Sequence, residues 1–127
     1  MGYRSNVKLA LKKQVYYDNQ ASILESIKDC DSISETEEAY FFLWESVKWY
    51  ESYEDVKAIT KLMSSLKSED FGFMRIGEDK DDIEEAGEPY EYDIYLVRQF
   101  FNENEDEEEL DKEEFFKPNS IKFIKEE

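Results

Sequence analysis

Alternation of apolar and polar residues marks the first predicted element. Over residues 3–11 the odd-numbered positions are mostly apolar and the even-numbered positions mostly polar. This period of two is typical of a β-strand with one buried face. A second strand is predicted over residues 40–49, which are rich in aromatic and β-branched side chains. Since aromatic residues fall on both of its faces, we expect this strand to be central in its sheet.

Two segments have the apolar spacing of amphipathic helices. Over residues 14–28 the apolar positions fit one helix face, although the weak helix formers at 18–20 allow a later start. Apolar residues at helical spacing predict a second helix over residues 56–66. Ser52, which is followed by acidic residues, is the expected N-cap of this second helix.

Two further strands and an acidic loop are predicted in the second half of the chain. Residues 71–76 and 90–101 are β-rich runs, which we interpret as antiparallel strands. The intervening residues 77–89 contain two Gly, one Pro and many acids, a composition typical of a loop. Residues 29–38 are polar and acidic, and we interpret them as a connector.

The order of these elements predicts an α+β fold. Strand, helix, strand, helix, strand, strand favours about four largely antiparallel strands with two helices on one sheet face. A chain of 127 residues has room for one domain, which we place at residues 1–101. Residues 102–127 form a predicted acidic C-terminal extension, in which Phe115 and Phe116 offer a means of docking.

Net charge narrows the class of partner. The chain has 33 Asp and Glu against 16 Lys and Arg, which gives a net charge of −17. Repulsion from phosphates excludes unaided binding to nucleic acid or to an anionic membrane, so the expected partner is a basic protein. With 16% aromatic residues the chain is nevertheless too apolar to remain disordered, and we expect a globular protein.

The lack of His and the single Cys exclude most common catalytic mechanisms. The chain has no His and a single Cys, Cys30, so the usual zinc sites, a disulfide and a His-based proton relay cannot form. Motifs for nucleotide binding and for nucleophilic hydrolases are absent from the sequence. We therefore expect no metal, no cofactor and no enzymatic activity. Acids on both sides of Cys30 raise a thiol pKa, which disfavours a reactive thiolate.

The N-terminal residues and the hydropathy pattern indicate where in the cell the protein is expected. Residues 1–11 alternate between apolar and polar and lack the continuous apolar run of a signal peptide. No apolar stretch approaches the roughly 20 residues that cross a membrane as a helix. We expect a cytoplasmic protein that does not bind membranes.

The acidic residues are grouped in segments. The excess of acids lies in residues 29–57, 78–93 and 102–127, and residues 103–114 alone hold nine acids. As a helix about 18 Å long, that last stretch would carry roughly one negative charge per 2 Å, close to the ~1.7 Å of duplex DNA. Such a surface can occupy a cleft built for phosphates. The alternative is that an acidic tail serves only solubility.

Three short segments carry a resemblance to a known group of proteins. Residues 2–5 read Gly-Tyr-Arg-Ser, residues 47–50 Val-Lys-Trp-Tyr, and residues 75–79 Arg-Ile-Gly-Glu-Asp. In this order they resemble a group of small bacteriophage and prophage proteins, over about residues 2–101. The resemblance implies a phage origin and a compact α+β fold, and with a phage origin the expected cytoplasm is that of a host bacterium. It implies no activity, and the acidic extension departs from the group.

Small acidic phage proteins without catalytic motifs are often inhibitors of host defence, and by this analogy we interpret the chain as an inhibitor that imitates DNA. It would occupy the basic nucleic-acid-binding cleft of a CRISPR effector or a restriction nuclease, without binding nucleic acid itself. Phe42 and Trp44 would add apolar contact beside the acids. The expected phosphate surrogates are Glu78, Asp79, Asp81, Asp82, Glu84, Glu85, Glu91, Asp93, Glu105, Asp106, Glu107, Glu108 and Glu109.

An alternative interpretation assigns binding to aromatic residues. Tyr40, Phe42 and Trp44 share one face of their strand, and an adaptor or structural protein of a phage would use them as an exposed patch if the extension leaves them uncovered. The acids would then serve only solubility. The same aromatic residues are also compatible with core packing. Arg4 and Arg75 are likewise compatible with ion pairs to acids across the sheet, in place of contacts with a partner.

Overall fold

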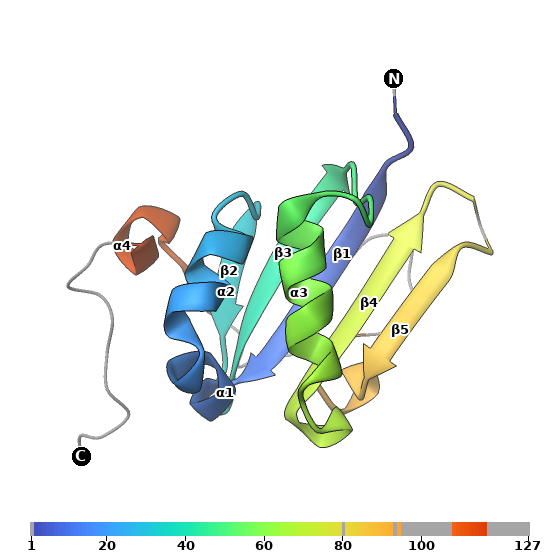
Figure 1. The fold of residues 1–127 in the computed structure, drawn as a ribbon. Helices are drawn as coiled ribbons and strands as arrows, with labels where there is room; N and C mark the ends of the chain where they lie inside the picture. The colour runs from blue at the N-terminus through green and yellow to red at the C-terminus, as the bar shows by residue number, and fades with distance from the viewer. Residues whose placement is uncertain (1, 80, 93, 95–107, 117–127) are drawn as a thin grey trace, which may run out of the picture.

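A computed structural model of the chain describes residues 2–79, 81–92, 94 and 108–116. In chain order the elements are β1 (Ser5–Lys12), α1 (Lys13–Asp18), α2 (Gln20–Ile27), β2 (Ser32–Glu35), β3 (Ala39–Val47), α3 (Glu54–Ser64), η1 (Ser68–Asp70), β4 (Phe71–Gly77), β5 (Ile83–Gly87), η2 (Pro89–Tyr92), β6 (Glu108–Leu110) and α4 (Lys112–Phe116). Helices α1, α2 and α3 lie across one face of an antiparallel sheet (Figure 1). The predicted α+β class is confirmed.

Over the residues that the structure describes, the sheet has six strands in the order β5-β4-β1-β3-β2-β6, and each neighbouring pair is antiparallel. From the sequence about four strands are expected. The additional strands include β2, which lies in the expected connector, and β6, which lies in the expected extension. With four and three residues respectively, both are too short to show an alternating pattern.

β1 lies at the centre of the sheet, paired with β3 on one side and with β4 on the other. Val7, Leu9 and Leu11 face the helices and are at most 1% exposed. Ala10 and Lys8 alternate with them toward the opposite face, where they are 0% and 4% exposed. The prediction that this strand buries one face is therefore wrong, because both faces are covered.

The second face of the sheet has its own apolar cluster. Phe41, Met74 and Ile76 are at most 2% exposed and pack together with Ile94, which is also 2% exposed. Tyr92 of η2 packs at the margin of this cluster, with its ring centroid 6.5 Å from that of Phe41. β3 therefore carries buried aromatic residues on both faces, which confirms the prediction that it is a central strand.

β4 and β5 form a hairpin, so part of the predicted acidic loop is a strand. Gly87 ends β5 with a φ of 67°, and a Cβ there would meet the Phe71 carbonyl, so this position requires glycine. Pro89 then opens the 3-10 helix η2. The strand predicted over residues 90–101 is thus wrong at its start, and residues 95–101 lie outside the described part of the chain.

The helices follow the predicted apolar pattern with two differences. Asn19 separates α1 from α2, and its side-chain nitrogen donates to a backbone carbonyl of α1 at 2.9 Å. The weak helix formers at 18–20 therefore interrupt one predicted helix. α3 begins at Glu54, and its N-cap is Tyr53 rather than Ser52. Among the helices that the structure describes, none combines the length and apolar character needed to cross a membrane.

The described part of the C-terminal extension is attached to the sheet and the core. β6 pairs with β2 at the edge opposite β5. Phe115 of α4 packs against Tyr40 with ring centroids 5.6 Å apart, and Nζ of Lys112 donates to the Cys30 carbonyl at 2.7 Å. The acidic helix considered for residues 103–114 is not continuous over its described part, because residues 108–110 form β6 and the helix α4 begins only at Lys112.

The aromatic face of β3 that points toward the helices is core rather than surface. Tyr40, Phe42 and Trp44 are 8%, 0% and 2% exposed. The Phe115 ring lies 6.3 Å from that of Phe42, and the Trp49 ring 5.1 Å from that of Trp44. The prediction that Phe42 and Trp44 contact a partner from an exposed patch is wrong, and the alternative of core packing is confirmed.

Replacing a buried ring should therefore cost stability. We expect Phe42→Ala to lower the free energy of unfolding by about 3–5 kcal/mol, because it removes a large apolar side chain and leaves a cavity. The control is Tyr53→Ala, at a ring that is 40% exposed, which should cost less than about 1 kcal/mol. Urea unfolding at unchanged m-value measures both. Equal losses for the two variants would contradict the assignment of Phe42 to the core.

Candidate functional site

The strand pairing brings two acidic segments to one end of the sheet. Ser5 pairs with Val47 of β3 and with Gly77 of β4, so the loop after β3 and the β4–β5 loop lie at the same end. The start of α3 and the α2–β2 loop lie there as well (Figure 1). We call the exposed carboxylates at this end the acidic rim. They are Asp29, Asp31, Glu45, Glu51, Glu54, Glu78, Asp79 and Asp81.

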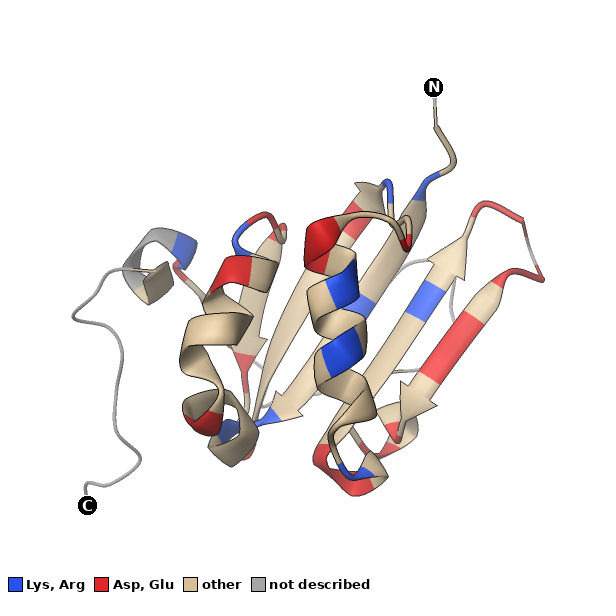
Figure 2. Ribbon diagram, in the orientation of Figure 1, with Lys and Arg blue, Asp and Glu red and all other residues tan. Residues whose placement is uncertain are grey.

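Figure 2 shows acidic residues at this end in the β4–β5 loop, at the start of α3 and in the loop that follows α2. The rim combines residues from two segments that are distant in the sequence, 29–57 and 78–93. From the sequence only Glu78, Asp79 and Asp81 of this group are expected as site residues. The others were detectable as the acid excess of residues 29–57, but only the strand order shows that the two segments meet.

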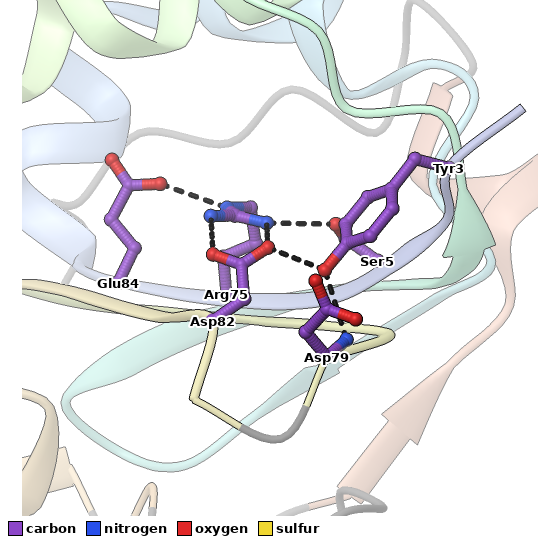
Figure 3. Close-up of polar contacts among 6 residues, drawn as sticks. All are labelled: Tyr3, Ser5, Arg75, Asp79, Asp82 and Glu84. Carbon is purple, nitrogen blue, oxygen red and sulfur yellow. Dashed lines mark hydrogen bonds and ion pairs between the residues drawn. The ribbon is translucent and has the colours of Figure 1, made fainter.

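Beside the rim, Arg75 of β4 is held by two carboxylates (Figure 3). Its Nη2 lies 2.7 Å from Oδ1 of Asp82, its Nη1 3.2 Å from the other oxygen of that group, and its Nε 2.8 Å from Glu84. Nη1 also donates to the Ser5 hydroxyl at 3.0 Å. The hydrogen bond to Asp82 is the main reason why the pKa of Arg75 is raised.

This network gives two of the expected site residues a role within the chain. Asp82 and Glu84 neutralise a guanidinium whose side chain is only 15% exposed. The Asp82 side chain is 32% exposed and that of Glu84 56%, so water screens the second pair more strongly. The alternative interpretation, in which Arg75 pairs with acids across the sheet, is confirmed.

Tyr3 connects the N-terminal segment to the hairpin loop. Its hydroxyl donates to Asp82 at 2.7 Å and accepts from the backbone N–H of Asp79 at 2.9 Å (Figure 3). The neighbouring N–H of Arg4 donates to the Glu78 carboxylate at 2.8 Å. The backbone N–H of Tyr3 donates to the Tyr50 hydroxyl, also at 2.8 Å. The loop that carries Asp79 is therefore bound to the N-terminal segment through two neighbouring residues, Tyr3 and Arg4.

A β-bulge shapes the rim at the end of β3. The register of β3 against β1 shifts between Ser5 and Val7, and Ser46 has a φ of 54°. Asp31 accepts from the backbone N–H of Glu45 at 2.6 Å, and Asn6 accepts from that of Ser46 at 2.8 Å. Two side chains from other elements thus satisfy the N–H groups that the bulge releases from the ladder.

Four further expected site residues that the structure describes do not join the rim. Glu85 of β5 accepts from the Tyr90 hydroxyl at 2.8 Å, and Glu91 is exposed in η2. Glu108 and Glu109 are exposed on β6, and with strands about 4.8 Å apart the two edges of six strands are separated by about 24 Å. Four more of them, Asp93, Glu105, Asp106 and Glu107, lie outside the described residues.

The opposite end of the sheet also carries acids, but basic side chains lie among them. Burial, followed by the nearby Asp70 and three glutamates, raises the pKa of Tyr92 to about 12. Lys12 lies 3.4 Å from Asp70, and Lys13 lies 2.9 Å from Glu35. At this end Asp70 and Glu35 are therefore paired with lysines within the chain.

An open groove of about 580 Å³ lies between α3 and the β4–β5 hairpin. Phe73 and Arg75 line it from the sheet, Met63 and Lys61 from α3, and Trp49 from the loop after β3. Among the residues that the structure describes, no group of acids or cysteine has the arrangement of a metal site. The side chains that line the groove are thus partly apolar and partly charged.

Cys30 is buried away from this surface. Burial is the main cause that raises the pKa of its thiol to about 12, and the flanking acids that the sequence points to contribute less. A thiol with this pKa remains protonated near neutral pH and is a poor nucleophile.

Comparison of the chain with protein-family models, with curated proteins and with solved structures finds no match. The chain is an α+β protein, and its described residues form a six-stranded antiparallel sheet with an acidic rim at one end and an open groove beside it.

Loss of the Arg75 guanidinium should destabilise the hairpin. We expect Arg75→Gln to lower the free energy of unfolding by about 1–3 kcal/mol, because Asp82 and Glu84 lose their charged donor. The control is Arg4→Gln, which removes an exposed contact to the Ser46 carbonyl and should cost less than about 1 kcal/mol. Chemical denaturation measures both values. A loss no larger for Arg75→Gln than for Arg4→Gln would show that the network does not stabilise the fold.

Proposed function

We propose that this protein is a non-enzymatic inhibitor of phage origin that imitates nucleic acid. It occupies the basic nucleic-acid-binding cleft of a host defence protein, such as a CRISPR effector or a restriction nuclease. The observation that supports this proposal is the acidic rim, where exposed carboxylates from two distant segments lie at one end of the sheet. The net charge of −17 also produces a negative long-range electrostatic field, which would attract a basic partner.

Among the described residues, the exposed basic side chains at the end of the sheet that carries the rim are fewer than the eight rim acids; they are Arg4, Lys28, Lys48 and Lys57. Lys28 lies 3.7 Å from Glu25 and Lys57 lies 4.0 Å from Glu54, each pair spaced i,i+3 on one helix. Such exposed pairs contribute little binding energy and are readily replaced by pairs with a partner. A partner cleft rich in Lys and Arg would gain from the release of counterions, as it does when it binds phosphates.

Some rim acids also have a structural role. Asp31 holds the β3 bulge and Glu78 accepts from the Arg4 backbone, so replacing either would alter the fold as well as the charge. Glu54 stands in the first turn of α3, where a negative charge stabilises a helix. Asp79 and Asp81 are exposed in the β4–β5 loop, and Glu51 is exposed in the loop before α3. Substitutions at these three positions therefore test the contribution of rim charge to binding.

The adaptor hypothesis has less support. It depends on an exposed aromatic sheet face, and the residues of that face, Phe42 and Trp44, are 0% and 2% exposed. The exposed large side chains include Tyr53 and Tyr90, which come from separate elements and make no aromatic face. Charge is therefore the surface property on which a test should concentrate.

The test uses matched charge variants. The rim variant carries Glu51→Gln, Asp79→Asn and Asp81→Asn, and the control variant carries Glu37→Gln, Glu38→Gln and Glu69→Gln at exposed positions of the opposite end. A partner captured from a bacterial lysate is purified, and its affinity for each variant is measured. We expect the rim variant to bind roughly tenfold or more weakly, and the control variant to lose less than about threefold.

Salt and competition provide the second part of this test. Affinity for the partner should fall steeply as the salt concentration rises, and DNA should compete with the protein for the partner. A partner that binds equally well at low and high salt, and that still accepts DNA while the protein is attached, would show that the protein does not imitate nucleic acid.

A further inference from the structure

β5 is an edge strand with backbone groups directed away from the sheet. Within the described residues it pairs with β4 alone. The N–H of Gly77 donates to the Asp82 carbonyl at 2.8 Å, and that of Glu88 donates to Phe71 at 2.9 Å. Because antiparallel strands alternate between inward and outward backbone groups, this pairing directs the N–H and carbonyl of Glu85 outward.

The side chains beside this edge suit a basic segment. Glu85 is exposed and accepts from the Tyr90 hydroxyl at 2.8 Å, and the Tyr90 residue is 45% exposed. A carboxylate next to an aromatic ring offers a lysine or arginine both an ion pair and a cation–π contact. On the other face of β5, the groove of about 580 Å³ offers apolar surface from Phe73 and Met63.

The same charges oppose pairing between two copies of this chain. Two β5 strands side by side would bring Asp81, Glu84 and Glu85 of one copy near those of the other. Like charges across neighbouring strands are destabilising, and charged edge strands are a common protection against self-association. The edge therefore favours an occupant with positive charge over a second copy.

We propose that β5 binds an extended lysine- or arginine-containing segment of the partner protein as an added strand. Backbone hydrogen bonds form at Glu85, alternate basic side chains of the segment contact Glu85 and Tyr90, and the intervening apolar side chains enter the groove beside α3. The proposal rests on the proposed function for the basic character of the partner, and it adds a backbone-mediated mode of recognition.

The test separates backbone pairing from charge at a single position. The probe is an acetylated and amidated octapeptide of alternating lysine and valine, and its affinity is measured by calorimetry. Glu85→Gln removes the charge and retains the N–H, whereas Glu85→Pro removes both. Proline is tolerated on an edge strand where the N–H faces solvent, so both variants should fold, and thermal unfolding checks this. We expect Glu85→Pro to bind at least tenfold more weakly than Glu85→Gln.

A second measurement uses the unmodified protein. On binding of the peptide, hydrogen exchange of the Glu85 amide should slow by at least tenfold, because a new strand protects the outward N–H. Equal affinity of the two Glu85 variants together with unchanged exchange would overturn strand addition. Protection that rises with protein concentration in the absence of peptide would identify a second copy as the occupant and would also overturn it.

These outcomes are independent of those for the proposed function. If the peptide protects Glu85 while rim variants leave binding of the host partner unchanged, strand addition is supported and the imitation of nucleic acid fails. If rim variants and salt weaken binding of the host partner while Glu85 stays unprotected, strand addition fails and the proposed function is retained.

Discussion

Burial of both faces of β1 is the constraint on which the rest of the molecule depends. Val7, Leu9 and Leu11 require the helices on one side, and Ala10 requires the cluster around Ile94 on the other. With both faces covered, the solvent-exposed parts of the sheet are its two edges and the loops at its ends. Charged residues can be accommodated there at low cost, and the acids are concentrated at these positions.

The sequence predicts best what depends on local periodicity. β1, β3, α3 and β4 lie close to their expected positions, because strong apolar patterns direct each of them toward a core. β5 was missed since Glu84 and Glu85 disfavour a strand by composition. Two features offset this low strand propensity: Glu84 forms an ion pair with Arg75, and β5 lies at the edge of the sheet. Both features depend on tertiary structure.

The location of the site residues likewise depends on tertiary structure. Alternation shows that Phe42 and Trp44 share one face, but it does not show whether helices cover that face. Acid counts identified residues 78–93, yet Asp82 and Glu84 of that segment neutralise Arg75 internally. Asp29 and Glu51 of the rim could not be assigned to a shared surface before the strand order was known.

The central position of β1 also affects how the chain folds during synthesis. β1 is made before its partner β3, which ends at Val47, some 35 residues after Lys12. With roughly 5–20 residues added per second, the emerging strand waits about 2–7 s for β3, and longer for β4. Throughout this interval its apolar side chains lack both neighbouring strands, so the nascent chain passes through a period in which it is exposed to aggregation before the sheet can form.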